Sequence, residues 1–436
     1  MGFSRQPPAA LATWLTRLVR RSGMWSEPAD MGSHFTRIDP DLVERILVLK
    51  PHDQLGDFMV ATPTLRALRE RFPTARITLV TRAFLADLAH AQPDVHEVLV
   101  LPRVSGLGEA LALARALGSV FRLRPHLAVV LNSVSRSKTA DALAAWSRAR
   151  VVVGRSHVGD GPLPAGLPAS PMPHFHQIVG SSFASENVYD VDVGIVAGSD
   201  HQSQRVLDLV APLGASAPWR VMRLALDGRT RAMGVETLER AWRTSGPVDR
   251  ASAAGSVVPA GTRGADAIPV AGASPNAGGH PRWIGLHPGA ANPLKCWPLD
   301  RFVALGVALA GGAEERRLAV FDSPREPERA RAVHTGLLAR GARAALVPPG
   351  PIGAFAGACS HLGLLVCNDS GVMHIAAALG VPTVSFHSLG RPSEWAPAHG
   401  RAVAFYADHA IETLPMQPAL EAAERLLAGA ELSARS

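Results

Sequence analysis

Three short stretches of the chain place charged or small polar residues where an apolar run gives way to a helix. In the first, "LVLKPHDQLGDFMVATP", Asp57 follows Gly56 and begins a helical pattern. A carboxylate in this position is either an N-terminal cap that complements the helix dipole or, if it faces a cleft, a general base that takes a proton from a hydroxyl. Spacing alone favours the cap for Asp57 and leaves the base as the alternative.

The second stretch, "LHPGAANPLKCWPLDRF", holds Lys295, one of three lysines in a chain that otherwise uses arginine; the others are Lys50 and Lys138. A compact ammonium group suits a phosphate as a point charge. The alternative is a solvated lysine ahead of a helix with Pro298 in its first turn. Trp297 is expected to pack in the interior rather than to stack on a nucleobase.

The third stretch, "NDSGVMHIAAALGVPT", sets four small or polar residues at the mouth of an apolar helix. The unpaired N–H groups and the dipole of a helix N-terminus make it a site for an anion, and Gly371 permits close approach. Asp369 suits sugar hydroxyls beside a phosphate, and His374 could donate to the phosphate itself. The alternative is an ordinary capped helix.

The elements that must position these residues form two alternating series. Apolar runs such as "RILVLK", "ARITLVTR" and "HLAVVLN" alternate with helical patterns over residues 44–228, and "RWIGLHPG", "RLAVFDS" and "LLVCND" begin the same alternation over residues 283–412. Strands that are apolar throughout are typical of parallel sheets covered on both faces. The sequence therefore predicts an α/β protein with two doubly wound, Rossmann-like domains whose ligands bind outside the carboxyl ends of the strands.

The remaining segments carry weaker patterns. Residues 1–43 are expected to be a poorly ordered leader, with an amphipathic helix lying on a membrane surface as the alternative. Residues 161–187 are rich in Pro, His and Ser and are expected to form a long loop. Residues 229–282 are interpreted as a flexible linker or insertion of Gly, Ala, Ser and Pro. Residues 413–436 are expected to form a helix that packs back across the cleft between the domains.

Composition limits the class of protein. The chain has 436 residues, of which 47% are hydrophobic and 19% charged, so two soluble domains with ordinary cores are expected. The three cysteines have neither a disulfide framework nor metal-ligand spacing, which favours a reducing compartment and no bound metal. A net charge of +7 suits an anionic ligand or an anionic surface. No G-x-G-x-x-G follows the first strand, which disfavours a dehydrogenase.

At this point the motifs resemble those of a known family. The segments "ILVLKPHDQLGDFMVATPTLRALRERFPTARITLV", "IGLHPGAANPLKCWPLDRFVAL" and "LLVCNDSGVMHIAAALGVPTVSF" are similar to glycosyltransferase family 9, the lipopolysaccharide heptosyltransferases. The resemblance runs through both domains in order. It implies the GT-B fold, inversion at the anomeric carbon and ADP-heptose as the donor, without a catalytic metal or other cofactor.

The resemblance also assigns roles to single residues. Asp57 matches the family's catalytic base, which reverses the preference for a cap, and Lys295 matches the lysine that contacts the donor's phosphate and sugar. The other residues matched to donor binding are Asp369, Ser370, Gly371, Val372 and His374, together with Glu326, or alternatively Glu328, at the ribose. Two departures stand out: Val372 replaces a common proline, and the loop from Lys50 to Asp57 is one residue longer than usual.

The sequence analysis therefore predicts an inverting glycosyltransferase that moves heptose from ADP-heptose to a lipopolysaccharide-core or related acceptor. The expected location is the cytoplasm, with peripheral contact at the inner face of the cytoplasmic membrane as an addition, and no nucleic acid partner is expected. The alternatives are a GT-B-like transferase or epimerase that uses a UDP- or GDP-linked sugar, and a non-catalytic sugar-nucleotide sensor. No pattern identifies the acceptor, although His174 and His176 lie in the long loop.

Overall fold

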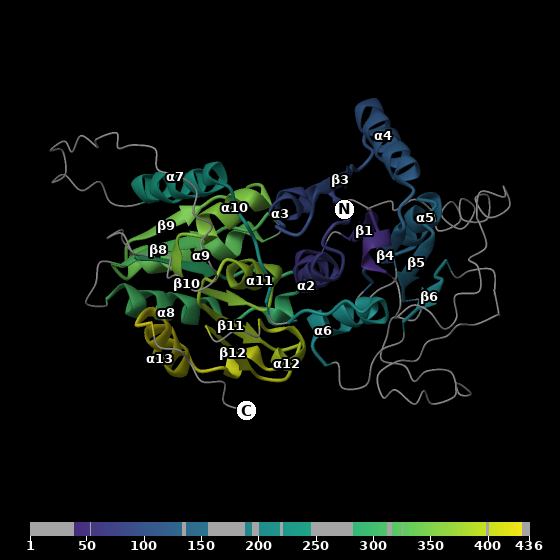
Figure 1. Ribbon diagram of the computed structural model, residues 1–436. Coiled ribbons are helices and arrows are strands. Elements are labelled where there is room, and N and C mark those ends of the chain that lie inside the picture. Colours follow the sequence, from purple (N-terminus) through teal and green to yellow (C-terminus); the bar gives the residue numbers. More distant parts are fainter. Residues whose placement is uncertain are drawn as a thin grey trace, which may run out of the picture. The chain divides into compact units, whose positions relative to one another are not determined.

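The computed structural model describes residues 39–52, 54–132, 137–155, 188–193, 200–218, 221–245, 282–311, 316–324, 326–397 and 401–429. The chain divides into two compact units, Met1–Ala225 and Leu226–Ser436, called here the N-terminal and C-terminal domains. Each contains one sheet flanked by helices (Figure 1). Residues 1–38 of the predicted leader (residues 1–43), and the predicted loop of residues 161–187 with His174 and His176, lie outside the described residues; Pro40–Leu42 form a 3₁₀ turn.

The N-terminal domain contains a six-stranded parallel sheet in the order β3-β2-β1-β4-β5-β6. Its strands are β1 (Arg45–Leu49), β2 (Arg76–Arg82), β3 (Glu97–Leu101), β4 (Leu127–Val130), β5 (Val151–Gly154) and β6 (Val191–Asp192). Its described helices are α2 (Leu55–Arg71), α3 (Ala86–His90), α4 (Leu107–Leu123), α5 (Lys138–Trp146) and α6 (Gln202–Leu207).

The C-terminal domain repeats this plan with the order β12-β11-β10-β7-β8-β9, again with every pairing parallel. Its strands are β7 (Arg282–His287), β8 (Arg316–Phe321), β9 (Ala344–Val347), β10 (Leu362–Asn368), β11 (Thr383–His387) and β12 (Ala402–Tyr406). Its described helices are α7 (Gly228–Ser245), α8 (Leu299–Ala310), α9 (Pro327–Ala339), α10 (Ile352–Cys359), α11 (Gly371–Ala378), α12 (Pro392–Trp395) and α13 (Met416–Leu427).

The sequence of strand β1 is apolar throughout because side chains on both of its faces are buried. Leu47 and Leu49 pack in one cluster with residues of α4 and α5, such as Val120 and Ala144. Their neighbours Ile46 and Val48 are equally buried, and successive side chains of a strand point to opposite faces. Both faces of the sheet are therefore covered, as the run "RILVL" predicted.

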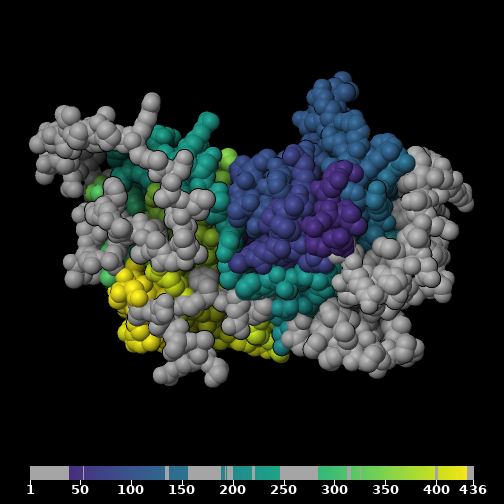
Figure 2. All heavy atoms as spheres, in the orientation of Figure 1, coloured from purple at the N-terminus to yellow at the C-terminus, as the bar shows by residue number. Residues whose placement is uncertain are grey.

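Helix α4 packs on this sheet through only part of its surface. Figure 2 shows α4 in blue, projecting beyond the rest of the N-terminal domain. Of its side chains only Ala116 and Val120 are buried, while Leu107 and Leu111 are exposed. The core of the domain therefore takes the second half of α4 and leaves its first turns in solvent.

Helix α7 corrects one sequence prediction. The assignment of residues 229–282 to a flexible linker or insertion is wrong for residues 229–245, which form most of α7, and residues 246–281 lie outside the described residues. Trp242 of α7 packs edge-on against Trp283 with ring centroids 5.6 Å apart, and the guanidinium of Arg343 lies 4.1 Å from the Trp242 ring. A Cβ at Gly234 would lie 2.1 Å from the carbonyl carbon of Gly357, so α7 and α10 touch through backbone.

The closing helix α13 lies within the predicted segment of residues 413–436. Its apolar face, which includes Ala419, Ala423 and Leu426, joins the same buried cluster as Phe302 of α8 and Ile284 of β7. The helix contacts α8, β10 and β11. The helix predicted within residues 413–436 is thus present, and its buried face belongs to the core of the C-terminal domain; packing back across a cleft between the domains stays a prediction.

The described helices are also informative about membranes. Within the described ranges, every helix is too short or too polar to cross a bilayer.

Candidate functional site

The two sheets share a topological feature that locates ligand sites in proteins of this class. In each, the first and fourth strands lie side by side at the centre and the strand order reverses there, at β1 and β4 and at β7 and β10. Ligands of such sheets bind outside the carboxyl ends of the strands, next to this reversal. All three sequence motifs follow strands at these two positions.

In the N-terminal domain, Lys50 connects the ends of the two central strands. It follows β1 directly, is buried, and its Nζ donates to the carbonyl oxygen of Leu131, just beyond β4, at 2.9 Å. Burial lowers the pKa of Lys50 to about 8, and the nearby carboxylate of Asp57 opposes this shift. The sequence marks Lys50 only as one of three lysines, at the start of a loop one residue longer than usual, because its partner Leu131 is distant in the chain.

Asp57 lies in the first turn of α2 but is not its cap. The N-cap residue is Gln54, whose side chain makes no capping bond. Only 4% of Asp57 is exposed, and its Oδ2 has no hydrogen-bond partner among the described residues. Burial raises the pKa of Asp57, and the positive charge of Lys50 partly opposes the rise. A buried carboxylate with a raised pKa and an unused oxygen is suited to accept a proton.

Helix α2 holds Asp57 in place although it contains Pro63. Proline lacks an N–H group, so the carbonyl of Met59 loses its usual helical partner. The hydroxyl of Thr62 donates to this carbonyl at 2.8 Å and replaces the missing bond. The segment "MVATP" therefore continues the helix through the proline.

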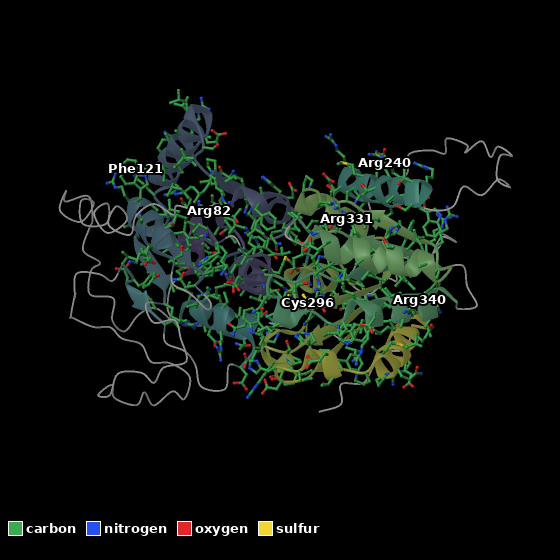
Figure 3. All side chains as sticks on the ribbon, turned by 180° about the vertical axis from the view of Figure 1, so that it is seen from behind. Arg82, Phe121, Arg240, Cys296, Arg331 and Arg340 are labelled. Carbon is green, nitrogen blue, oxygen red and sulfur yellow. The ribbon has the colours of Figure 1, made fainter. Side chains whose placement is uncertain are left out.

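In the C-terminal domain, Lys295 and Asp369 form an ion pair of 2.6 Å between Nζ and Oδ2. Lys295 ends a 3₁₀ turn in the loop after β7, and Asp369 follows β10. Cys296, labelled in Figure 3, comes next in the chain and marks this loop. The side chain of Lys295 is 28% exposed and that of Asp369 only 7%, so the lysine forms the accessible part of the pair.

Asn368 holds the two halves of this ion pair together. Its Oδ1 accepts from the backbone N–H of Trp297 at 3.0 Å, and its Nδ2 donates to the carbonyl of Pro288 at 2.8 Å. Trp297 is fully buried and stacks on Phe386 with ring centroids 3.9 Å apart. The expectation that Trp297 packs in the interior is confirmed. The role of Asn368 was missed, because its partners precede it by many residues.

The third motif forms the predicted helix N-terminus. Ser370 is the N-cap of α11, and its hydroxyl oxygen is buried with no hydrogen-bond partner among the described residues. Gly371 and Val372 open the helix, and His374, one turn in, is 1% exposed. The free N–H groups and dipole of this turn favour a negative charge beside Lys295 and Asp369.

Glu326 also reaches this loop, whereas Glu328 does not. Glu326 is the N-cap of α9, and its Oε2 accepts from the backbone N–H of Ala290, in the loop after β7, at 3.2 Å. Glu328 lies in the first turn of α9 and is exposed. Of the two alternatives for a ribose contact, the structure brings only Glu326 to the loop of Lys295.

Two buried histidines at this edge were not predicted. His287 and His387 are the last residues of β7 and β11. Burial lowers the pKa of His287 to about 4 and lowers that of His387 as well, so both rings are neutral near pH 7. The available signal was a polar residue at the end of an apolar run, in "IGLH" and "VSFH". Among the described residues no group of His, Cys, Asp or Glu could hold a metal ion.

Comparison with solved structures places this geometry among known folds. A glycosyltransferase family 9 protein from Veillonella parvula is 18% identical with a TM-score of 0.66, covering 90% of this chain and 99% of that one. The ADP-heptose LPS heptosyltransferase II of E. coli is 16% identical with a TM-score of 0.61, covering 88% and 99%. The E. coli heptosyltransferase WaaC, solved with ADP, is 15% identical with a TM-score of 0.59, covering 88% and 99%. At these identities the likeness establishes the GT-B fold.

Sequence comparison adds the family. Residues 266–422 match the family model of glycosyltransferase family 9 (heptosyltransferase), and they include Lys295, Glu326 and the turn from Asp369 to His374. A comparison with curated proteins finds no match. The resemblance is thereby confirmed for residues 266–422, which form a glycosyltransferase family 9 domain, and the predicted fold class is confirmed as well: the chain is a glycosyltransferase with the two-domain GT-B fold.

Proposed function

We propose that this protein is an inverting glycosyltransferase that transfers heptose from ADP-heptose to a lipopolysaccharide-core or related glycan acceptor. The observation that carries the proposal is the Lys295–Asp369 ion pair beside the N-terminus of α11, inside the residues that match family 9. A cation, a helix N-terminus and a carboxylate form a site for a diphosphate joined to a polyhydroxylated sugar.

Asp57 is the proposed general base. Its ionised carboxylate takes the proton of the acceptor hydroxyl while that oxygen attacks the anomeric carbon from the face opposite the diphosphate. The C–O bond to the diphosphate breaks in the same displacement, so the configuration inverts. Burial, the raised pKa and the unused Oδ2 of Asp57 support this role.

Lys295 and the N-terminus of α11 are proposed to stabilise the departing diphosphate. The ammonium group is the accessible member of its ion pair, so it can turn to a phosphate oxygen. Ser370 offers a hydroxyl without a partner among the described residues, and His374 lies in the same turn. Positive charge fixed before the reaction stabilises the charge that develops on the leaving group, without a metal ion.

Asp369 and Glu326 are proposed to bind hydroxyl groups of the donor. Asp369 accepts from the sugar beside the phosphates once Lys295 engages the diphosphate. The position of Glu326 at the start of α9, bonded to the loop after β7, supports a contact with the ribose. Gly371 and Val372 are proposed to line the phosphate turn through their backbone.

The donor nucleotide is tested by isothermal titration with ADP, UDP and GDP. The proposal expects ADP to bind and the other two to bind much more weakly, and the related E. coli heptosyltransferase was solved with ADP. Tight binding of UDP or GDP with no response to ADP would support the alternative, a GT-B-like transferase or epimerase for another nucleotide sugar.

The acceptor and the cellular location are tested in the organism. Mass spectrometry of surface glycans from a deletion strain is expected to reveal a missing heptose, which would identify both the sugar and its attachment point. Unchanged glycans would contradict the proposed pathway. The proposed site of action is the cytoplasmic side of the inner membrane. Cell fractionation is therefore expected to find the protein in the cytoplasm or bound peripherally to that membrane.

A further inference from the structure

We propose that His387, with Ser385 behind it, is a positioning residue that orients the carboxylate of Asp369 toward the donor sugar. The role in donor binding depends on the function proposed above. The geometry itself does not, because it concerns only how three side chains meet at the carboxyl ends of β10 and β11.

The backbone places His387 beside Asp369. Strands β10 and β11 are neighbours in which Asn368 pairs with Phe386, and the N–H of Asp369 donates to the carbonyl of Phe386 at 2.8 Å. His387 is the next residue of β11 and is 0% exposed. Its Nδ1 lies 4.0 Å from Oδ1 of Asp369, the oxygen that Lys295 does not hold.

The hydroxyl of Ser385 can serve either tautomer of His387, and the charge of Asp369 selects between them. Residues two apart on a strand share a face, and the hydroxyl of Ser385 lies 2.8 Å from Nε2 of His387. A neutral imidazole has one donor and one acceptor nitrogen. If Nε2 carried the proton, the lone pair of Nδ1 would face the carboxylate of Asp369. If Ser385 donates to Nε2, the proton is on Nδ1 and points toward Asp369, which is the electrostatically favourable arrangement.

Burial keeps the ring of His387 neutral. Burial lowers the pKa of His387 most, Asp369 opposes this shift and Lys295 reinforces it. A neutral ring supplies a hydrogen-bond donor without adding a second cation, so it does not neutralise the carboxylate that must accept from hydroxyl groups. Nδ1 has no hydrogen-bond partner among the described residues, so it is available for this purpose.

The N–H group at Nδ1 of His387 becomes important for Asp369 when a diphosphate binds. The ammonium of Lys295 then has phosphate oxygens to bind, and its hold on Asp369 weakens. The N–H at Nδ1 of His387 can take over by closing from 4.0 Å to hydrogen-bond distance. On the other side, a Cβ at Gly390 would lie 3.1 Å from Oδ2 of Asp369, so only glycine leaves that side of the carboxylate uncrowded. Asp369 thereby stays oriented.

The tautomer is tested by ¹⁵N NMR of the histidine rings, with the His387 signals assigned from their loss in His387→Asn. We expect Nδ1 to be protonated and Nε2 to be the acceptor, and we expect Ser385→Ala to weaken this preference. A ring of His387 protonated at Nε2 in the wild-type protein would overturn the proposal, whatever the enzyme's substrate is.

The positioning role is tested by titration with ADP and with ADP-heptose. His387→Leu should weaken ADP-heptose binding by about tenfold, the scale of one charge-assisted hydrogen bond, and leave ADP binding little changed because Asp369 serves the sugar. His387→Asn places an amide N–H near the position of Nδ1 and should restore most of the loss. The control is His334→Leu on α9, whose ring meets the carbonyl of Ala344 at the opposite end of the sheet.

The outcomes separate the two proposals. Equal loss of ADP and ADP-heptose binding in His387→Leu, with no rescue by asparagine, would show a purely structural histidine and contradict the positioning role. Binding of neither ligand by the wild-type protein would contradict the proposed donor instead, and the tautomer measurement would then decide the role of His387 alone.

Discussion

Replacing Lys50 with methionine removes a buried ammonium group. Burial makes the charged form of this group less stable in the native N-terminal domain than in the unfolded chain. The pKa of Lys50 is lowered from 10.5 to about 8 by burial. At a pH between these two pKa values, Lys50 binds a proton in the unfolded chain but not in the native protein. Native stability therefore rises as pH increases through this window, since unfolding must then take up a proton.

The size of the effect follows from the pKa. One pKa unit corresponds to about 1.36 kcal/mol, so the rise from about pH 8 to pH 9.5 is about 1.5 units, or about 2 kcal/mol. Other titrating groups contribute equally to wild type and variant and cancel in their difference. A methionine side chain has no proton to exchange, so the Lys50→Met variant should lack this gain.

Urea unfolding of both proteins between pH 7 and 9.5 measures the difference. The free energy of unfolding of the wild type should gain about 2 kcal/mol on Lys50→Met across this range. The matched control is Lys138→Met, which changes an exposed lysine in the same domain and should follow the wild type at every pH. Parallel curves for wild type and Lys50→Met would refute the argument that Lys50 is buried with a lowered pKa.

Three further predictions follow from the same structure. Gly234→Ala should destabilise the C-terminal domain by about 1–3 kcal/mol or more, because its Cβ would meet the backbone of Gly357 at 2.1 Å. Thermal unfolding measures this loss. The control is Gly228→Ala, where no atom lies within 4 Å of the new Cβ. The acid limb of kcat/KM should lie above the ordinary aspartate pKa of 3.8, because Asp57 must be ionised and burial raises its pKa; Lys50→Met should move that limb to still higher pH, and a limb at or below 3.8 in the wild type would contradict the assignment. EDTA should leave the transfer rate unchanged if, as proposed, Lys295 and the N-terminus of α11 supply the positive charge. A rate lost to EDTA and restored by Mg²⁺ would contradict this.

Periodicity predicted the two sheets because buried parallel strands leave a strong local signal. Runs such as "RILVL" and "LLVCN" are apolar on both faces, and the structure places them at the sheet centres as β1 and in β10. Helix α7 left no such signal. Its buried face consists of Gly234, Leu238, Ala241 and Trp242, and its other positions are mainly polar, so the window resembled the polar segment that follows it.

The candidate site was predictable where it depends on short motifs and not where it depends on strand pairing. Asp57, Lys295 and the turn from Asp369 each stand at a strand–helix junction that the sequence marks. The bond from Lys50 to Leu131 and the approach of His387 to Asp369 join residues that only the sheet brings together. Nothing in the local sequence distinguishes such a histidine from one that ends a strand at the surface.

The central claim is that Asp57 removes the acceptor proton while the C-terminal domain binds the donor. The most direct test compares Asp57→Asn with wild type in two measurements, ADP-heptose binding and heptose transfer to the acceptor glycan identified from the deletion strain. The account predicts donor affinity close to that of wild type and a transfer rate reduced by about 10²- to 10⁴-fold. Transfer by Asp57→Asn at the wild-type rate would contradict it.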